Sequence, residues 1–154
     1  VQVPSIYPEL TVLENVWLAA YARARDQHAA ERRASSVLHW LGLHDQAHRR
    51  AGVLSHGEQQ WLEIGLVLTA DPSVIMLDEP TAGMTRQETN RTVEIVQRLA
   101  AERAVIVVEH DMYFVRQLAA PTTVLHQGRV FAHGPLDDIR ADERVLDIYL
   151  GRGG

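Results

Sequence analysis

The feature that most constrains the fold is a short apolar run that leads directly into two acids, Val74-Ile75-Met76-Leu77-Asp78-Glu79-Pro80. An apolar run without alternating polar residues is typical of a strand buried on both faces in a parallel sheet. Ligands of open α/β sheets bind at the carboxyl ends of such strands, where Asp78 and Glu79 stand. The run therefore predicts an α/β fold with a candidate site at this edge of the sheet.

Two adjacent carboxylates at the rim of a core repel each other and are costly to desolvate. A divalent cation would remove that cost, because one carboxylate could hold Mg²⁺ while the other polarises a water molecule. The alternative is a strand end with two solvated acids. The strand by itself favours neither interpretation.

Composition narrows the function classes. The chain has 154 residues, enough for one domain with a core, and 46% of them are apolar. The net charge of −5, without a basic block, argues against nucleic acid as a main partner. The absence of cysteine excludes disulfides and thiol nucleophiles. No apolar run approaches the roughly 18 residues of a membrane-spanning helix.

Capping boxes, in which a hydroxyl residue precedes a glutamate by three positions, predict helix starts at Thr11, Ser55 and Thr85. The predicted helices cover residues 11–25, 28–41, 57–69, 85–101, 111–118, 136–140 and 142–150, with Gly42 as a C-terminal cap. In these helices Trp40, Val93, Val96 and Ala100 are expected in the core. A second apolar strand covers 104–108, and residues 122–126 and 129–133 flank Gln127-Gly128 as a hairpin.

One of these helix starts, at Ser55, and the end of the second strand, at His110, carry further candidate groups for binding phosphate. At Ser55 and Gly57, free N–H groups, the helix dipole and a hydroxyl would all face a phosphate. A plain N-cap is the commoner meaning of an isolated Ser-His-Gly-Glu. A strand–helix–strand unit would bring His110 to the sheet edge of Asp78 and Glu79. A lone histidine is usually a polar residue without a catalytic or binding role. A histidine at the sheet edge opposite two carboxylates is a better candidate for contacting a phosphate.

Together these segments resemble the ATP-binding subunit of an ABC transporter. Residues 54–60 resemble the signature loop, and residues 74–80 resemble the Walker B strand with its catalytic glutamate. Residues 108–111 are similar to the H-loop with its switch histidine. Gln2, ahead of Leu10-Thr11-Val12-Leu13-Glu14-Asn15-Val16, resembles the Q-loop glutamine, and Ala82-Gly83-Met84-Thr85 the D-loop.

The D-loop and Glu109-His110-Asp111-Met112 further resemble the branch that imports branched-chain amino acids and urea. Within that branch, Leu54-Ser55-His56-Gly57 with Trp61-Leu62-Glu63-Ile64-Gly65 looks most like the urea-type subunit. The signature of the ABC family as a whole is usually Leu-Ser-Gly-Gly-Gln, so His56 in place of the first glycine and Glu58 in place of the glutamine are departures. Thr85 stands where the D-loop usually ends in Asp, which leaves cross-dimer contacts by this residue open.

The sequence contains no G-x-x-x-x-G-K-[ST], the loop that cradles nucleotide phosphates. Because Gln2 would lie downstream of that loop, the resemblance implies a truncated chain, the back two thirds of a domain. It is expected to have a Q-loop (1–10), a helical signature subdomain (11–70), an ATPase core (71–135) and a C-terminal helical tail (136–154). The strand of the missing loop would lie between 104–108 and 122–126.

The resemblance also implies a mechanism in which two subunits sandwich two ATP molecules. Asp78 would hold Mg²⁺ through water, Glu79 would act on the attacking water, and His110 would contact the γ-phosphate. Gln2 would sense Mg²⁺ and that water. The signature loop, Ser55, His56, Gly57 and Glu58, would meet the nucleotide of the other subunit. Closure would act on membrane permease subunits, which would hold the protein at the cytoplasmic face of the membrane.

Three other interpretations stay open. A lipid-exporter ATPase shares much of the motif set. A non-transport ABC ATPase would usually carry coiled coils or basic insertions, and neither is visible. The third is a non-enzymatic interaction fragment, because residues 1–154 without a phosphate loop are expected to be inactive alone.

Overall fold

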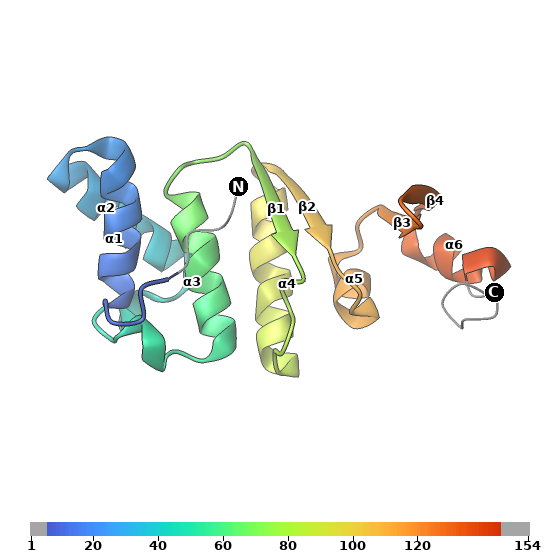
Figure 1. Ribbon diagram of the computed structural model, residues 1–154, viewed down its shortest axis with the longest axis horizontal. Coiled ribbons are helices and arrows are strands. Elements are labelled where there is room, and N and C mark those ends of the chain that lie inside the picture. The colour runs from blue at the N-terminus through green and yellow to red at the C-terminus, as the bar shows by residue number, and fades with distance from the viewer. Residues whose placement is uncertain (1–5, 146–154) are drawn as a thin grey trace. The chain divides into compact units, whose positions relative to one another are not determined.

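A computed structural model of the chain describes residues 6–145, so Gln2 lies outside the described residues. The chain divides into two compact units, residues 1–108 and 109–154. Within the described residues, the first unit holds four α-helices and a parallel strand pair, and the second holds a hairpin and two short helices (Figure 1). The four predicted segments with boundaries at 11, 71 and 136 remain predictions.

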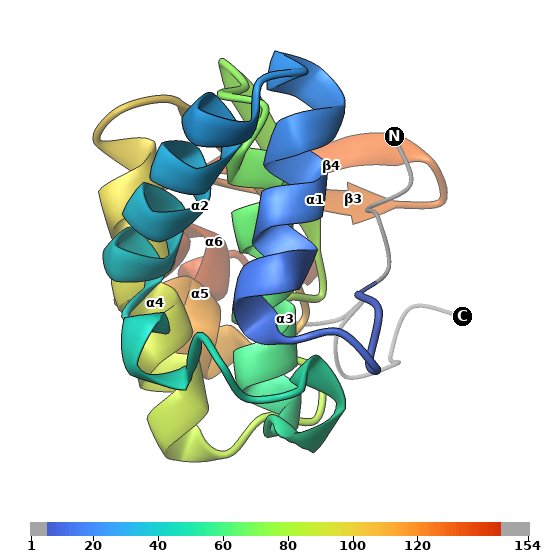
Figure 2. The same cartoon turned by 90° about the vertical axis from the view of Figure 1, so that its left-hand side faces the viewer.

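The start of α1 and the end of α2 lie where capping residues predict. At the start of α1 (Val12–Ala24), the Thr11 hydroxyl accepts from the Glu14 N–H at 3.1 Å, and the Glu14 carboxylate accepts from the Thr11 N–H at 2.7 Å. Helix α2 (Gln27–Leu41) ends at Gly42, whose φ of +73° forms the predicted left-handed cap. Figure 2 shows α1 and α2 packed side by side.

A single apolar core joins the elements of the first unit. Two 3₁₀ turns, η1 (His44–Gln46) and η2 (Ala51–Val53), lead into α3 (His56–Leu68), which has Ser55 as its N-cap. Fully buried side chains come from each helix of this unit, among them Val16, Leu38, Leu62 and Ile95. The helices predicted from caps and apolar spacing are therefore held by tertiary packing of their apolar faces.

The predicted strand–helix–strand unit is confirmed. Strands β1 (Val74–Asp78) and β2 (Ala104–Val108) pair in parallel, with Val74 opposite Ala104 and Asp78 opposite Val108. Helix α4 (Arg86–Ala100) connects them and packs against β2. Because the strands run in parallel and in this register, both end at the same edge of the sheet.

The prediction that the β1 strand is buried on both faces is wrong for the described residues. Ile75 is 3% exposed, but Val74 is 52% and Met76 is 69% exposed. On β2, Ile106 and Val108 are exposed as well. The reason is that the first unit supplies a packing layer on one face of this two-stranded sheet only. Alternate side chains of a strand point to opposite faces, so every second residue is left exposed.

Two predicted core positions also differ. Val93 and Val96 are buried as predicted, but Ala100 is exposed, and Ile95 and Leu99 complete the apolar stripe of α4 instead. A stripe with a period of 3.6 residues drifts around the helix, which leaves Ala100 at its rim. Trp40 is only partly buried, at the edge of the core, where the Arg98 guanidinium lies 4.3 Å from its ring centre.

In the second unit, α5 (Met112–Leu118) is followed by β3 (Thr122–His126), β4 (Arg129–Gly134) and α6 (Leu136–Ala141). Strands β3 and β4 pair antiparallel around Gln127 and Gly128, which both have positive φ, so the predicted hairpin is confirmed. The helical segment predicted over 142–150 lies largely outside the described residues.

Asn15 fixes the loop that enters α1. Its side chain is almost fully buried; Oδ1 accepts from the Tyr7 N–H at 2.7 Å, and Nδ2 donates to the Tyr7 and Thr11 carbonyls at 3.0 and 2.9 Å. A buried backbone group that loses its partner is costly. The carboxamide of Asn15 therefore stabilises the chain path between residues 7 and 11.

We predict that Asn15→Leu lowers the free energy of unfolding by about 1–3 kcal/mol, because it leaves the Tyr7 N–H without its acceptor and removes one of the two donors to the Tyr7 carbonyl. Asn15→Asp keeps the shape but cannot donate to the two carbonyls, and it should destabilise at least as much. Urea unfolding measures both changes. The control is Gln27→Leu at the exposed start of α2, expected within about 0.5 kcal/mol of the parent. Equal, small effects at both positions would contradict the role given to Asn15.

Candidate functional site

Asp78 and Glu79 stand at the carboxyl end of β1, where the sequence predicts a site. Asp78 is the last residue of the strand. Glu79 follows it with a φ of +45°, and its N–H donates to the Val108 carbonyl at 2.8 Å. A left-handed conformation is unfavourable for a non-glycine residue by roughly 1–2 kcal/mol. This strained residue turns the chain out of the sheet and fixes where the loop begins.

The side chains of Asp78 and Glu79 are both exposed. The premise that these two carboxylates are desolvated at the rim of a core is therefore wrong for the described residues. Among residues 6–145, no group of three or more His, Asp or Glu side chains gathers into a metal site.

The loop from β1 to α4 consists of two consecutive tight turns. The Ala82 N–H donates to the Glu79 carbonyl and the Met84 N–H to the Thr81 carbonyl, each at 3.1 Å. Gly83 has a φ of +71°, which suits a glycine. Thr85 then caps α4 through the predicted capping box with Glu88.

Ser55 caps α3 in the same way. Its N–H donates to the Glu58 carboxylate at 2.9 Å, and its hydroxyl accepts from the Glu58 N–H at 3.3 Å. Glu58 therefore points back at the backbone of Ser55, as the capping box predicts. The other carboxylate oxygen of Glu58 accepts from the Gln46 side chain.

Glu88 joins the two helix starts, and the sequence reasoning did not identify it as part of the site. Its Oε2 accepts from the Thr85 N–H at 2.9 Å and the Thr85 hydroxyl at 2.8 Å. Its Oε1 accepts from the Ser55 hydroxyl at 2.8 Å and the Gly57 N–H at 3.3 Å. These bonds, that of the Thr85 N–H foremost and those of the Ser55 and Thr85 hydroxyls next, lower the pKa of Glu88 to about 2.

His56 makes a second link between the same two loops. Its Nε2 lies 3.1 Å from the Ala82 carbonyl oxygen, a hydrogen bond that requires the proton on Nε2. Further along the same two helices, the Trp61 indole N–H donates to the Thr92 hydroxyl at 2.9 Å.

A hollow lies between the starts of α3 and α4. Its lining residues are Ser55, Glu58, Trp61, Thr85, Gln87, Glu88 and Arg91.

His110 belongs to the second unit. Its side chain is largely exposed, with Nδ1 3.7 Å from the carboxylate of Glu109. That carboxylate also accepts from the His110 N–H at 2.8 Å. Asp111 caps α5, as predicted, by accepting from the Tyr113 N–H at 2.8 Å. The placement of His110 at one edge with Asp78 and Glu79 stays a prediction.

The family described as ABC transporter matches residues 1–82, more than half of the chain. The chain belongs to the ABC transporter family. A second family, described as branched-chain amino acid ATP-binding cassette transporter, matches residues 129–154. The resemblance of the motifs to an ABC ATP-binding domain is thereby confirmed.

Curated relatives of this ABC chain include transport and import ATP-binding proteins. The high-affinity branched-chain amino acid transport ATP-binding protein LivG of Salmonella typhimurium is 32% identical over 95% of this chain. BraF of Pseudomonas aeruginosa, with the same description, is also 32% identical over 95% of the chain. The chain spans 64% of the length of each. The ribose import protein RbsA of Caldanaerobacter subterraneus is 31% identical, and the chain spans 31% of it.

Solved ABC cassettes share the fold. An ATP-binding cassette of an ABC transporter in its ADP conformation is 26% identical, with a TM-score of 0.80, over 94% of this chain and 64% of that one. A nucleotide-free ATP-binding cassette is 25% identical, with a TM-score of 0.79, over 92% of this chain and 63% of that one. The predicted α/β fold of a partial ABC ATPase domain is therefore confirmed.

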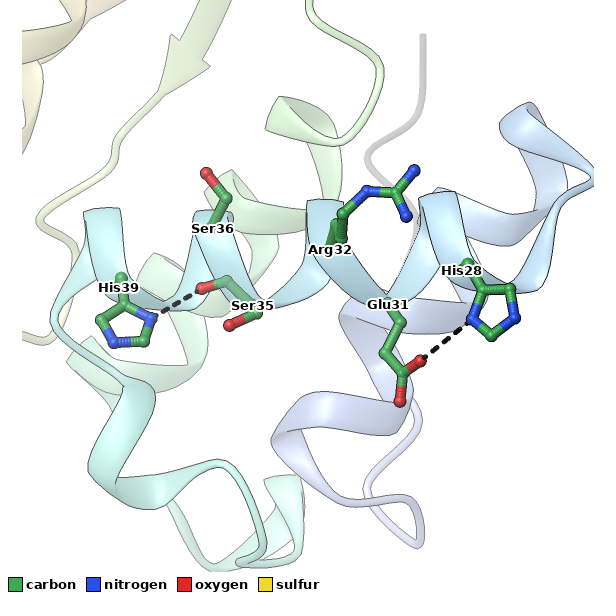
Figure 3. A pocket seen from close by; sticks show the side chains of 6 residues that line it. All are labelled: His28, Glu31, Arg32, Ser35, Ser36 and His39. Carbon is green, nitrogen blue, oxygen red and sulfur yellow. Dashed lines mark hydrogen bonds and ion pairs between the residues drawn. The ribbon is translucent and has the colours of Figure 1, made fainter.

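A second hollow of the ABC chain lies on the exposed side of α2 (Figure 3). There His28 faces Glu31 at 4.0 Å, and the His39 Nδ1 lies 3.0 Å from the Ser35 carbonyl oxygen. These contacts stay within one helix, and none of the predicted site residues lines this hollow. None of the helices in the described part of the chain is long and apolar enough to cross a membrane.

The lowered pKa of Glu88 predicts how stability depends on pH. The folded pKa of about 2 lies below the ordinary value of 4.5, so the carboxylate stabilises the fold above pH 4.5. That contribution should disappear as the pH falls from about 4.5 to about 2. Because the group is partly exposed, we expect the loss to be on the order of 1 kcal/mol. Glu88→Gln should remove this part of the pH dependence in urea unfolding from pH 2 to 7. An unchanged pH profile would contradict the four-bond geometry.

Proposed function

We propose that this chain is part of an ATP-binding and ATP-hydrolysing subunit that powers an ABC importer. The observation that carries the proposal is the pair Asp78-Glu79 at the carboxyl end of a parallel strand, in a chain that belongs to the ABC family. Two subunits would sandwich two ATP molecules. Catalysis of phosphoryl transfer is chiefly positioning and stabilisation of charge, so residues fixed at a sheet edge suit it.

Asp78 is the proposed ligand of Mg²⁺, held through water. In phosphate-transfer sites Mg²⁺ binds one or two carboxylates, and water and substrate phosphates complete its shell. An exposed carboxylate at the end of β1 fits such an incomplete set of protein ligands. Gln2 would add an amide oxygen. When bound, the ion would offset negative charge on the phosphates.

The residues of the chain would divide the remaining work. Glu79 would orient the attacking water and take its proton, and its backbone bond to Val108 would hold it at the sheet edge. His110 would contact the γ-phosphate. Ser55 and Gly57 would contact the γ-phosphate bound to the partner subunit, with His56 and Glu58 holding the loop. Ala82, Gly83, Met84 and Thr85 would form the D-loop at the subunit interface.

We propose branched-chain amino acids or urea as the transported solute. The match of residues 129–154 to the branched-chain amino acid family and the descriptions of LivG and BraF support the amino-acid alternative. The Leu54-Ser55-His56-Gly57 segment, which resembles the urea-type subunit, supports the second. Uptake of labelled leucine and labelled urea by cells, with and without the gene, separates the two.

The proposed partners are a second ATP-binding subunit and membrane permease subunits, with no nucleic acid. The protein would then work at the cytoplasmic face of the membrane, attached through the permease. Residues 1–154 alone are proposed to be inactive, because the sequence lacks the phosphate-cradling motif. A lipid-exporter ATPase, a non-transport ABC ATPase and an interaction fragment remain alternatives, which identification of copurifying membrane subunits would distinguish.

Substitutions of Asp78 and Glu79 should have different effects on a full-length protein that also carries the phosphate loop. Glu79→Gln keeps the shape but removes the base, so ATP should bind while turnover falls by roughly 10²- to 10⁴-fold. Unhydrolysed ATP should then hold a long-lived dimer. Asp78→Asn should weaken Mg²⁺ binding without trapping the dimer. Gel filtration with Mg-ATP, beside phosphate release, compares them. Normal hydrolysis by Glu79→Gln, or an identical ATP-bound dimer of both variants, would refute this division of roles.

Ser55→Arg tests the signature loop in the same protein. The substitution removes the hydroxyl and places a bulky cation beside Glu88, so nucleotide should still bind each monomer while dimer-dependent hydrolysis falls sharply. The matched control is Asp26→Arg, which removes the N-cap of α2 and carries the same cost of about 1 kcal/mol for a lost cap. Full turnover by Ser55→Arg, or equal loss in both variants, would show that the loop has no role across the dimer.

A further inference from the structure

The Ser55 hydroxyl and the Gly57 N–H each have one hydrogen to donate, and each already donates it in a hydrogen bond. The Ser55 hydroxyl donates to the Glu88 Oε1 at 2.8 Å, and it accepts from the Glu58 N–H as the N-cap of α3. The Gly57 N–H points to the same Glu88 oxygen at 3.3 Å. A hydroxyl has a single donor hydrogen, and a backbone amide also has one. Neither group can donate to a phosphate while it donates to Glu88.

We propose that the Glu88 carboxylate occupies, within its own chain, the two donors with which the signature loop would meet the γ-phosphate held by the partner subunit. The inference rests on the proposed function. It follows that the loop contacts the phosphate only after Glu88 has turned away, and that Glu88 opposes formation of the ATP-bound dimer. A carboxylate left in place would also face the phosphate as a like charge at close range.

The arrangement of the carboxylate allows such a local exchange. Oε2 bonds to Thr85 and holds the capping box of α4, whereas Oε1 bonds to Ser55 and Gly57. A rotation of the Glu88 side chain can therefore release Ser55 and Gly57 without unwinding α4. The contacts His56–Ala82 and Trp61–Thr92 would keep the two loops together during the exchange. The hydrogen bonds that lower the pKa of Glu88 to about 2 keep its carboxylate ionised near neutral pH, so phosphate and not protonation would release it.

Glu88→Gln tests the proposal in the full-length protein. Glutamine can serve as the third residue of a capping box, so the start of α4 is retained. The neutral amide holds Ser55 and Gly57 less strongly than a carboxylate does, because hydrogen bonds to charged groups are about twice as strong as neutral ones. The matched control is Glu94→Gln, the same change on the same helix at a residue that pairs with Arg91. Thermal unfolding confirms that each variant is folded.

Light scattering measures the ATP concentration at which half of the protein is dimeric. Every variant also carries Glu79→Gln, so that bound ATP is not hydrolysed. We expect Glu88→Gln to lower that concentration about three- to tenfold, a modest range because the site is partly exposed, and Glu94→Gln to leave it unchanged. Glu88→Asp, too short to bridge both loops, should act in the same direction and serves if the glutamine variant does not fold. In an amide spectrum without nucleotide, the Gly57 resonance should shift in Glu88→Gln and not in Glu94→Gln.

The outcomes separate this proposal from the proposed function. If the Glu79→Gln parent dimerises with ATP and Glu88→Gln needs as much ATP as Glu94→Gln, or more, then Glu88 does not oppose the dimer and the inference is overturned. The proposed function would then stand. If the parent forms no ATP-dependent dimer, the proposed function itself fails, and the role of Glu88 fails with it.

Discussion

The first unit depends on one interaction that recurs at three helix starts, the exchange of hydrogen bonds between a hydroxyl residue and a glutamate three positions later. Thr11 with Glu14 begins α1, Ser55 with Glu58 begins α3, and Thr85 with Glu88 begins α4. Each box satisfies backbone N–H groups that a helix otherwise leaves without partners. The boxes of α3 and α4 also fix the two loops in which the ABC motifs stand, so local helix chemistry positions the candidate site.

Such local rules explain what could be predicted from the sequence. A capping box, an apolar stripe or a Gly-containing turn is complete within a few residues, and the helices, the strand–helix–strand unit and the hairpin follow from them. No local sequence pattern predicts the bonds of the Glu88 Oε1. Its partners, Ser55 and Gly57, lie more than 30 residues away in sequence, and only packing of α3 against α4 brings them within reach. The capping role of Glu88 was therefore predictable, but its role in the site was not.

The exposed face of the β1–β2 pair shows the converse case. The apolar run that contains Val74 and Met76 correctly predicts a strand. Its composition is typical of a strand that is packed on both faces, and this second expectation is wrong here. Burial, however, depends on how many layers the surrounding chain supplies, and the described residues of the first unit supply one for this sheet. The same limit applies to Asp78 and Glu79, whose expected desolvation presupposed neighbours on every side. Sequence pattern thus predicted the element more reliably than its surroundings.

The contacts of His56 and Glu58 give a physical meaning to the departures of the proposed signature loop from Leu-Ser-Gly-Gly-Gln. His56, in place of the first glycine, reaches the Ala82 carbonyl, and Glu58, in place of the glutamine, closes the capping box on Ser55. The His56 substitution adds a contact inside the subunit that a glycine could not make, whereas glutamine at position 58 could also close the capping box. Neither substitution removes the Ser55 hydroxyl or the Gly57 N–H as a donor. The contact of His56 stiffens the loop, whereas the bonds of Glu88 to Ser55 and Gly57 set whether the loop can receive an anion. Stiffness and availability of the loop are therefore set by different residues, and substitutions can change one without the other.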